Sequence, residues 1–402
     1  MKVDSKHRNV APAQRKAVDT GFECTALLLQ GGGALGSYQA GVYEALHEHG
    51  VEPNWIAGIS IGAINAAIIA GNAPDKRIAA LRAFWDMVTD AGDTGWADRA
   101  MGQMMGTWLG DAGRQWVNRL AAGRAMMTGV PGFYTPRFPP PQLLADGAPG
   151  AASFYDTAKL RQTLAQLVDF DRINHKKAMR FSVGAVNVRT GNFAYFDTES
   201  VTIIPEHIMA SGALPPAFEA VEIDGEHYWD GGIVSNTPLD WILNTYPLND
   251  TLAFQVDLWS ARGALPRSLG EVATRLKEVQ FSSRTRSSTD HFRQLQKVRG
   301  ALTDLLSQLS PEQRDGDAAR YLAMVADPCV YNIVQLIYRS PAWELQSKDY
   351  EFSRATMRDH WQAGLDDARR TLAQPEIFRR PKEAQAVQVF DYCSAAHEKG
   401  EK

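Results

Sequence analysis

The sequence predicts an α/β protein with a central, mostly parallel sheet, and three observations support this fold class. Two short apolar runs, Thr25–Gln30 and Trp55–Ile59, have the composition of buried parallel strands. Each run is followed by apolar residues at helical spacing, and this strand–helix–strand–helix order is typical of parallel sheets. The chain of 402 residues is 45% hydrophobic and 22% charged, which is ordinary for a globular protein and excludes a disordered or fibrous class.

The first part of the chain supplies the expected core elements in order. Residues 1–24 form a polar tail without the apolar segment of a secretory signal. The longest apolar run, Ile56–Gly71, has 16 residues, whereas a membrane-spanning helix needs about 20. We therefore expect no spanning segment. The apolar spacing predicts helices at Ser37–His49, at about Ile61–Ala70 and at Asp75–Thr89.

Residues 91–150 interrupt this pattern. Their helical periodicity is weak, glycines are frequent, and methionines, tryptophans and, toward the end, prolines accumulate. Methionine and tryptophan together make an adaptable apolar surface. The composition therefore predicts an inserted cap of short helices with an irregular, proline-stiffened end.

Regular patterning returns after this insertion. A helix is expected at Asp156–Val168, with Asp156 as its N-cap. Beyond Ser260 the chain is predicted to be mostly amphipathic helix. The other predicted elements are hairpins of Arg180–Val188 with Asn192–Phe196 and of Val221–Ile223 with His227–Trp229, a helix at Pro205–Ser211, and strands at Thr251–Leu258 and Val330–Tyr338.

The first candidate site is a G-x-S-x-G sequence, Gly58-Ile59-Ser60-Ile61-Gly62. It lies between a predicted buried strand and a predicted helix, the context in which this motif presents a serine nucleophile on a sharp turn. Gly58 and Gly62 leave room for the neighbouring strand and helix, and the helix N-terminus favours developing negative charge. We favour a catalytic Ser60 over a chance match in a glycine-rich turn.

The second candidate is the loop Gly31–Gly36, of sequence GGGALG, directly after the first predicted strand. Consecutive glycines let backbone N–H groups converge on one oxygen, which suits a phosphate or an oxyanion. The pattern also fits the dinucleotide motif G-x-G-x-x-G, but that site needs an acidic residue at the end of the second strand, and Glu52 precedes it. We favour an oxyanion hole over a nucleotide site, with Gly31, Gly32, Gly33 and Gly36 as its motif residues.

The third candidate is Asp230-Gly231-Gly232, at the end of a predicted strand. An aspartate followed by glycines can approach a partner side chain closely, although alone it is better explained as a turn residue. His227 precedes it by three residues, and on a hairpin its side chain is expected to point away from that of Asp230. A catalytic role for His227 is therefore not favoured.

Taken together, the three motifs resemble the patatin-like phospholipase family. The resemblance covers about Ala26–Pro238. It is densest at Leu28–Gly41, Ile56–Ala67 and Ser211–Leu239, the last beginning with Ser211-Gly212-Ala213-Leu214-Pro215-Pro216. Arg284-Thr285-Arg286 and Ser347–Ser353 are similar to the C-terminal extension of one bacterial subgroup of this family.

The resemblance implies a three-layer patatin-like fold with a central mostly parallel sheet, an inserted cap and a helical C-terminal extension. Residues 1–24 would be a polar tail and residues 25–240 the hydrolase domain, with the cap insertion at about 91–150. Residues 241–402 would hold the last core strand and the helical extension.

The function implied by the resemblance is lipid acyl hydrolysis through an acyl-enzyme. Ser60 would be the nucleophile, Asp230 the proton acceptor, and the glycine loop the oxyanion hole, with no metal or cofactor. A serine needs an adjacent base, and burial raises the pKa of a carboxylate toward neutrality. Leu35 departs from the family, which often has Arg or Lys there, so a preference for anionic head groups is in doubt.

Three alternatives remain open at this stage. An intracellular polyester or oligoester depolymerase would use the same dyad. A Ser-His-Asp esterase would use His291 or His360 as its base. A non-catalytic module would bind a phosphate in the glycine loop.

Composition limits the partners. The formal net charge is −4, which gives no reason to expect nucleic acid binding. We expect a lipid or ester substrate, with peripheral membrane contact left open through the basic run Ser282–Arg299, whose simpler interpretation is a solvated helix face. Three widely spaced cysteines favour a reducing compartment and a cytoplasmic protein. The oligomeric state is not predicted.

Overall fold

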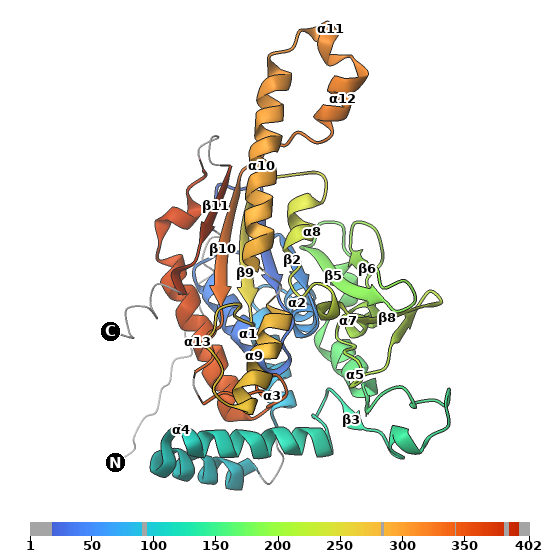
Figure 1. Cartoon of the computed structure of the whole chain (residues 1–402), viewed down its shortest axis with the longest axis vertical. Coiled ribbons are helices and arrows are strands. Elements are labelled where there is room, and N and C mark those ends of the chain that lie inside the picture. Colours follow the sequence, from blue (N-terminus) through green and yellow to red (C-terminus); the bar gives the residue numbers. More distant parts are fainter. Residues whose placement is uncertain (1–17, 91–94, 283–284, 342, 382–385, 394–402) are drawn as a thin grey trace, which may run out of the picture.

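The computed structural model describes residues 18–90, 95–282, 285–341, 343–381 and 386–393 (Figure 1). For residues 95–109 and 285–288 it describes the backbone alone. Most of the predicted N-terminal tail and Arg284 therefore lie outside the described residues, as does the side chain of Arg286.

A nine-stranded sheet forms the centre of the molecule, in the order β11-β10-β9-β1-β2-β5-β8-β7, with β6 also paired to β5. From β11 to β5 all neighbouring strands are parallel, and β6, β7 and β8 pair antiparallel. The strand bounds are β1 Cys24–Leu29, β2 Trp55–Gly58, β5 Arg180–Asn187, β6 Phe193–Asp197, β7 Val221–Ile223, β8 Glu226–Asp230, β9 Thr251–Asp257, β10 Tyr331–Ile337 and β11 Val387–Phe390.

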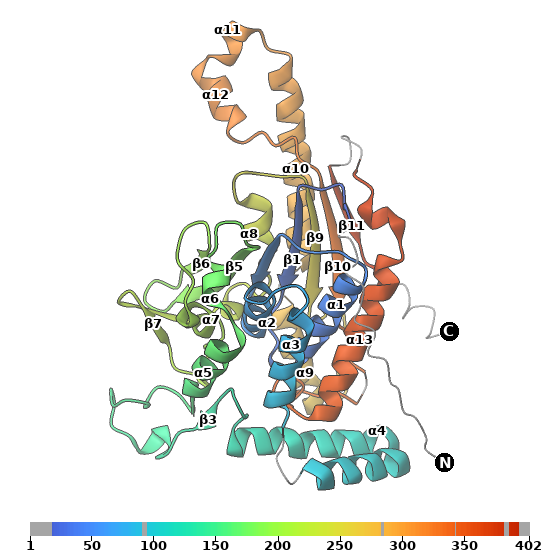
Figure 2. The same cartoon turned by 180° about the vertical axis from the view of Figure 1, so that it is seen from behind.

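Helices cover both faces of this sheet and give three layers (Figures 1 and 2). Side chains alternate along β1: Leu27 and Leu29 join a core with the helices of one face, and Ala26 and Leu28 join a second core on the other face. The first core includes residues of α1 (Ser37–Glu48), α2 (Ile61–Ala70), α3 (Arg77–Val88) and α13 (Arg354–Leu372). The second includes residues of α8 (Leu239–Asn244) and α10 (Thr285–Ser307).

The C-terminal region is built into the core. Helix α13 packs along α1, and both helices have a glycine at the crossing, Gly41 and Gly364, where a Cβ atom would collide with the backbone of the other helix. Two further strands, β10 and β11, follow β9 in the sheet. The region therefore supplies three strands of this sheet as well as helices. The sequence pattern indicated the strand at Val330–Tyr338 but not the short β11.

The insertion forms a helical arm beyond the carboxyl ends of the parallel strands (Figure 1). Helix α4 (Gly95–Thr128) bends sharply at Gly110, whose φ of 55° and ψ of −137° are not helical. A two-stranded sheet of β3 (Thr135–Pro136) and β4 (Tyr155–Asp156) follows. Each half of α4 is longer than the short helices expected from its weak periodicity.

Most predicted elements agree with the structure to within two residues. The N-cap of α5 (Ala158–Leu167) is Thr157 and not Asp156, because Asp156 ends β4 and its carboxylate accepts the Ala158 N–H from there at 2.7 Å. The remaining helical elements are η1 Gly33–Gly36, η3 Pro141–Leu143, α6 Phe170–Ile173, α7 Pro205–Ser211, η4 Gly231–Ile233, α9 Leu269–Phe281, α11 Pro311–Arg314, α12 Asp317–Ala323 and η5 Pro375–Phe378. Within the described residues, no helix has both the length and the apolarity to cross a membrane.

Candidate active site

Ser60 lies on a strained turn between β2 and α2. Its φ of 56° and ψ of −124° lie in a region that a residue with a Cβ rarely adopts, at a typical cost of about 1–3 kcal/mol. The surrounding structure holds this turn: the Ser60 N–H donates to Ser211 Oγ at 2.9 Å, and Ser211 is fully buried. The side chain of Ser60 is thereby presented at the N-terminus of α2.

Asp230 lies at the end of β8, beside β5, and is 3% exposed. Burial raises the pKa of Asp230 to about 7, although hydrogen bonds from the Ser60 side chain and the Gly232 backbone oppose this effect. The Gly232 N–H donates to Asp230 Oδ1 at 2.7 Å. The structure therefore brings Ser60 and Asp230 together from positions 170 residues apart in the sequence, with a carboxyl group that titrates near neutral pH.

The glycine loop runs beside this pair. A Cβ atom on Gly31 would lie 3.0 Å from the Cβ of Ser60. At every motif glycine a Cβ atom would come within 3.0 Å of a neighbouring atom, which explains why no larger residue fits there. These glycines are Gly31, Gly32, Gly33, Gly36, Gly58, Gly62, Gly231 and Gly232.

Two N–H groups of this loop are left without an acceptor within the described residues. The N–H of Gly31 donates to Asn236, that of Ala34 to the Asp349 carbonyl at 2.8 Å, and that of Leu35 to the Gly32 carbonyl at 3.2 Å. The N–H groups of Gly32 and Gly33 remain. Adjacent N–H groups without an acceptor are the kind of donors that an oxyanion requires.

The side chains considered for rival sites are either paired with other residues or exposed. Glu52 precedes β2, at the end opposite Ser60, and pairs with Arg77 at 2.6 Å and with His47 at 2.7 Å. His227 and His291 are exposed. His360 is buried, and its Nε2 lies 2.6 Å from Glu344 Oε1. In the described part of the chain, no cluster of three or more His, Cys, Asp or Glu residues could hold a metal ion.

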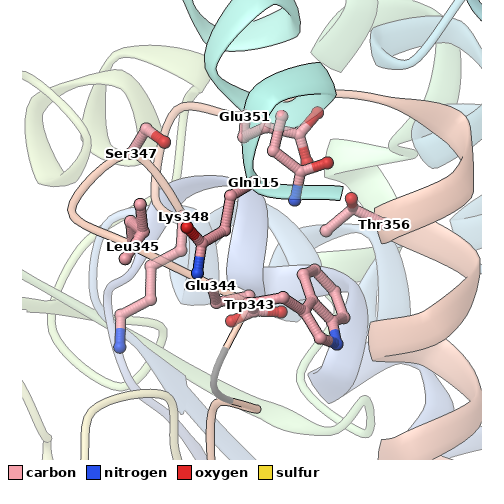
Figure 3. A pocket seen from close by; sticks show the side chains of 9 residues that line it. Gln115, Trp343, Glu344, Leu345, Ser347, Lys348, Glu351 and Thr356 are labelled. Carbon is pink, nitrogen blue, oxygen red and sulfur yellow. The ribbon is translucent and has the colours of Figure 1, made fainter. Parts of the chain in front are cut away.

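A small hollow is lined by none of the predicted site residues (Figure 3). It lies between α4 and the segment from Trp343 to Thr356. Glu344 and Glu351 line it, as does Lys348, whose ammonium pairs with Glu278 at 2.8 Å. The same segment supplies the Asp349 carbonyl that accepts the Ala34 N–H. The C-terminal region therefore helps to hold the glycine loop in place.

Sequence reasoning missed three residues that hold the loop and the serine, namely Ser211, Asn236 and Trp259. Ser211 and Asn236 lie within the segments that carry the family resemblance, but nothing in the sequence indicated what they bind. Trp259 follows β9 and lies outside that resemblance. Each contacts a residue more than 150 positions away in the sequence, and no local sequence pattern predicts such a contact.

The class of protein follows from three features that lie at the ends of strands in a mostly parallel sheet. They are a serine on a strand–helix turn, a buried aspartate and a glycine loop, and together they define a hydrolase-type α/β protein. A family model described as patatin-like phospholipase matches residues 27–241, more than half of the 402 residues. A second model, described as patatin phospholipase, matches residues 279–384. The chain belongs to the patatin-like phospholipase family, which confirms the resemblance seen in the motifs and supports lipid acyl hydrolase activity on ester bonds in general.

Comparisons with individual proteins are less close. The crystal structure of VipD from Legionella pneumophila is similar to the chain, with 14% sequence identity and a TM-score of 0.38, over 96% of this chain and 77% of that chain. No curated protein sequence matches the chain significantly.

Proposed function

We propose that the protein hydrolyses carboxylic esters of lipids with Ser60 as nucleophile and Asp230 as general base. One observation carries the proposal: a serine in a strained turn lies next to a buried carboxyl group whose pKa burial raises to about 7. A base with a pKa near the working pH is the most effective at removing a proton in the transition state. The family supplies the substrate class, a lipid acyl ester.

The reaction has two halves. Asp230 takes the hydroxyl proton while Ser60 Oγ attacks the ester carbonyl, and the tetrahedral oxyanion accepts hydrogen bonds from the Gly32 and Gly33 N–H groups. The C–O bond then breaks, the leaving alcohol takes the proton from Asp230, and the acyl group stays on Ser60. Water attacks this ester with Asp230 again as base, which releases the fatty acid and restores the serine.

The proposed cellular setting is the cytoplasm, and the thiols support this proposal. Cys24, Cys329 and Cys393 are free in the structure, and Cys24 and Cys393 are buried. Unpaired thiols favour a reducing compartment, which supports a cytoplasmic protein that would meet its lipid substrates at a membrane periphery.

Labelling with a fluorophosphonate tests the catalytic serine, and an ester panel tests the substrate class. We expect one adduct at Ser60 in the wild type and none in Ser60→Ala, with hydrolysis of phospholipid, lysophospholipid and short-chain esters lost in that variant. A folded wild-type protein without an adduct would exclude the hydrolase and favour phosphate binding. Faster turnover of hydroxyalkanoate oligomers than of any lipid would favour the depolymerase, and loss of activity in His291→Ala or His360→Gln with retention in Asp230→Asn would favour a histidine base.

A further inference from the structure

We infer that Asn236 and Trp259 are positioning residues that together aim the Gly32 N–H at the oxyanion. Both side chains hold the carbonyl oxygen of Gly31, the other end of the same peptide group. The inference rests on the proposed function, because it assigns a role in stabilising the tetrahedral intermediate. It adds two residues that lie outside the three motifs, and Trp259 also lies outside the segments that carry the family resemblance.

The Asn236 side chain forms hydrogen bonds with both the N–H and the C=O of Gly31. Its Oδ1 accepts the Gly31 N–H at 3.1 Å, and its Nδ2 donates to the Gly31 carbonyl at 3.0 Å. The same Nδ2 donates to the Phe281 carbonyl at 2.8 Å, which ties this contact to the end of α9. With 3% of its surface exposed, Asn236 is shielded from competing water.

Trp259 supplies the second donor. Its indole Nε1 donates to the Gly31 carbonyl at 3.0 Å, and its backbone N–H donates to Gln30 Oε1 at 3.0 Å. Trp259 is 3% exposed. Its ring contacts Phe281, with ring centroids 5.7 Å apart, and the Lys348 ammonium, 5.0 Å from the ring centre. The indole therefore has little freedom to turn away from the loop.

The geometry of a peptide group connects these contacts to catalysis. The Gly31–Gly32 peptide is trans, so its C=O and N–H point in opposite directions. Two donors on the oxygen therefore fix the Gly32 N–H on the side away from Asn236 and Trp259, where no described residue accepts it. Hydrogen bonds on a carbonyl also polarise its peptide group, which strengthens the N–H as a donor by about 10–30%.

A purely structural role makes a different prediction. Buried indole N–H groups generally need an acceptor wherever they lie, and Trp55 shows this elsewhere in the fold, since its Nε1 donates to Ser182 Oγ at 2.8 Å. If Trp259 acted only in this way, removing either indole N–H would cost stability and leave the chemical step unchanged. Trp55→Phe is therefore the matched control for Trp259→Phe.

The experiment measures kcat and KM on a short-chain ester, the Ki of an alkyl boronic acid that forms a tetrahedral anion on Ser60, and the melting temperature. For Trp259→Phe we expect kcat to fall about tenfold, a fraction of the 10²–10³ that a lost oxyanion donor costs. KM should change less than twofold, and the boronate Ki should rise by the same factor as kcat/KM falls. Asn236→Ala should follow the same pattern more strongly, and Trp55→Phe should leave the kinetics unchanged.

Two outcomes overturn the inference. One is a kcat for both Trp259→Phe and Asn236→Ala within twofold of that of Trp55→Phe. The other is a fall in kcat without the matching rise in boronate Ki. If Trp259→Phe does not fold, Asn236→Ala is decisive by the same two measurements. Failure of the proposed function is distinct, because the wild type itself would then neither turn over the ester nor bind the boronate at Ser60.

Discussion

Replacing Asp230 by asparagine should abolish ester hydrolysis and make the protein more stable above pH 7. Burial raises the pKa of Asp230 to about 7 from an ordinary value of 3.8. Between these pH values the folded protein keeps a proton on Asp230 that the unfolded chain has released. The free energy of unfolding therefore falls as the pH rises through this window.

The size of the effect follows from the two pKa values. The ionised carboxylate costs the folded state about 4 kcal/mol by pH 8, at 1.36 kcal/mol for each pKa unit. Asparagine does not ionise and avoids this cost. It accepts more weakly from the Gly232 N–H and the Ser60 hydroxyl, which offsets about 1–2 kcal/mol. We expect Asp230→Asn to be about 2 kcal/mol more stable than the wild type at pH 8, and no more stable at pH 4.5.

Urea unfolding at both pH values measures this difference, with the exposed Asp146→Asn as the control for a charge change. A pH profile of kcat/KM measures the base directly: since Asp230 must be ionised, the rate should rise about tenfold for each pH unit below 7 and level off above it. The reasoning is refuted if Asp230→Asn gains no stability between pH 4.5 and 8, or if wild-type kcat/KM is flat from pH 5 to 9.

Three further substitutions, one of them paired with a control variant, test other parts of the site and its support. Ser60→Gly should abolish hydrolysis yet raise the free energy of unfolding by about 1 kcal/mol, because glycine tolerates the positive φ; chemical denaturation measures this, and a loss of stability would contradict the strain. Gly62→Ala should destabilise by several kcal/mol, because its Cβ would strike the backbone of β1, while Gly123→Ala, which meets open space on a helix, should gain up to about 1 kcal/mol; equal melting temperatures would refute the packing argument. His360→Gln should cost about 3–5 kcal/mol by leaving Glu344 buried without its charged partner, which is read from urea unfolding at pH 6, and a cost under 1 kcal/mol would contradict it.

The local parts of the site could be predicted from the sequence because each is a short turn between regular elements. Gly58–Gly62 lies between an apolar strand and an apolar helix, and Gly31–Gly36 follows a strand in the same way, so periodicity alone gave their context. That these turns lie together with Asp230 came from the family resemblance, because no local pattern encodes a contact across 170 residues.

The supporting residues of the site could not be predicted from the sequence, because their roles depend on contacts between polar groups that are far apart in the chain. Asn236 in a Ser-Asn-Thr-Pro segment looks like any turn asparagine, and only the fold places it against Gly31, 205 positions away. The same holds for Trp259, whose apolar surroundings conceal the role of its N–H. Strand β11 was missed because four residues in a polar context carry too little periodicity to indicate a strand.

The strand order has a consequence for how the protein can be produced in pieces. The six residues of β1 are all buried and lie between β2 and β9, so a fragment ending near residue 241 would expose the hydrogen-bonding edge of an apolar strand to solvent. Such open edges pair with other chains and aggregate. A recombinant fragment must reach at least Asp257 for β9 to pair with β1. Strands β9 and β10 then need β10 and β11 as their own neighbours, so the fragment must extend through Phe390. The segments matched by the two family models should therefore unfold in one cooperative transition and resist separation by limited proteolysis.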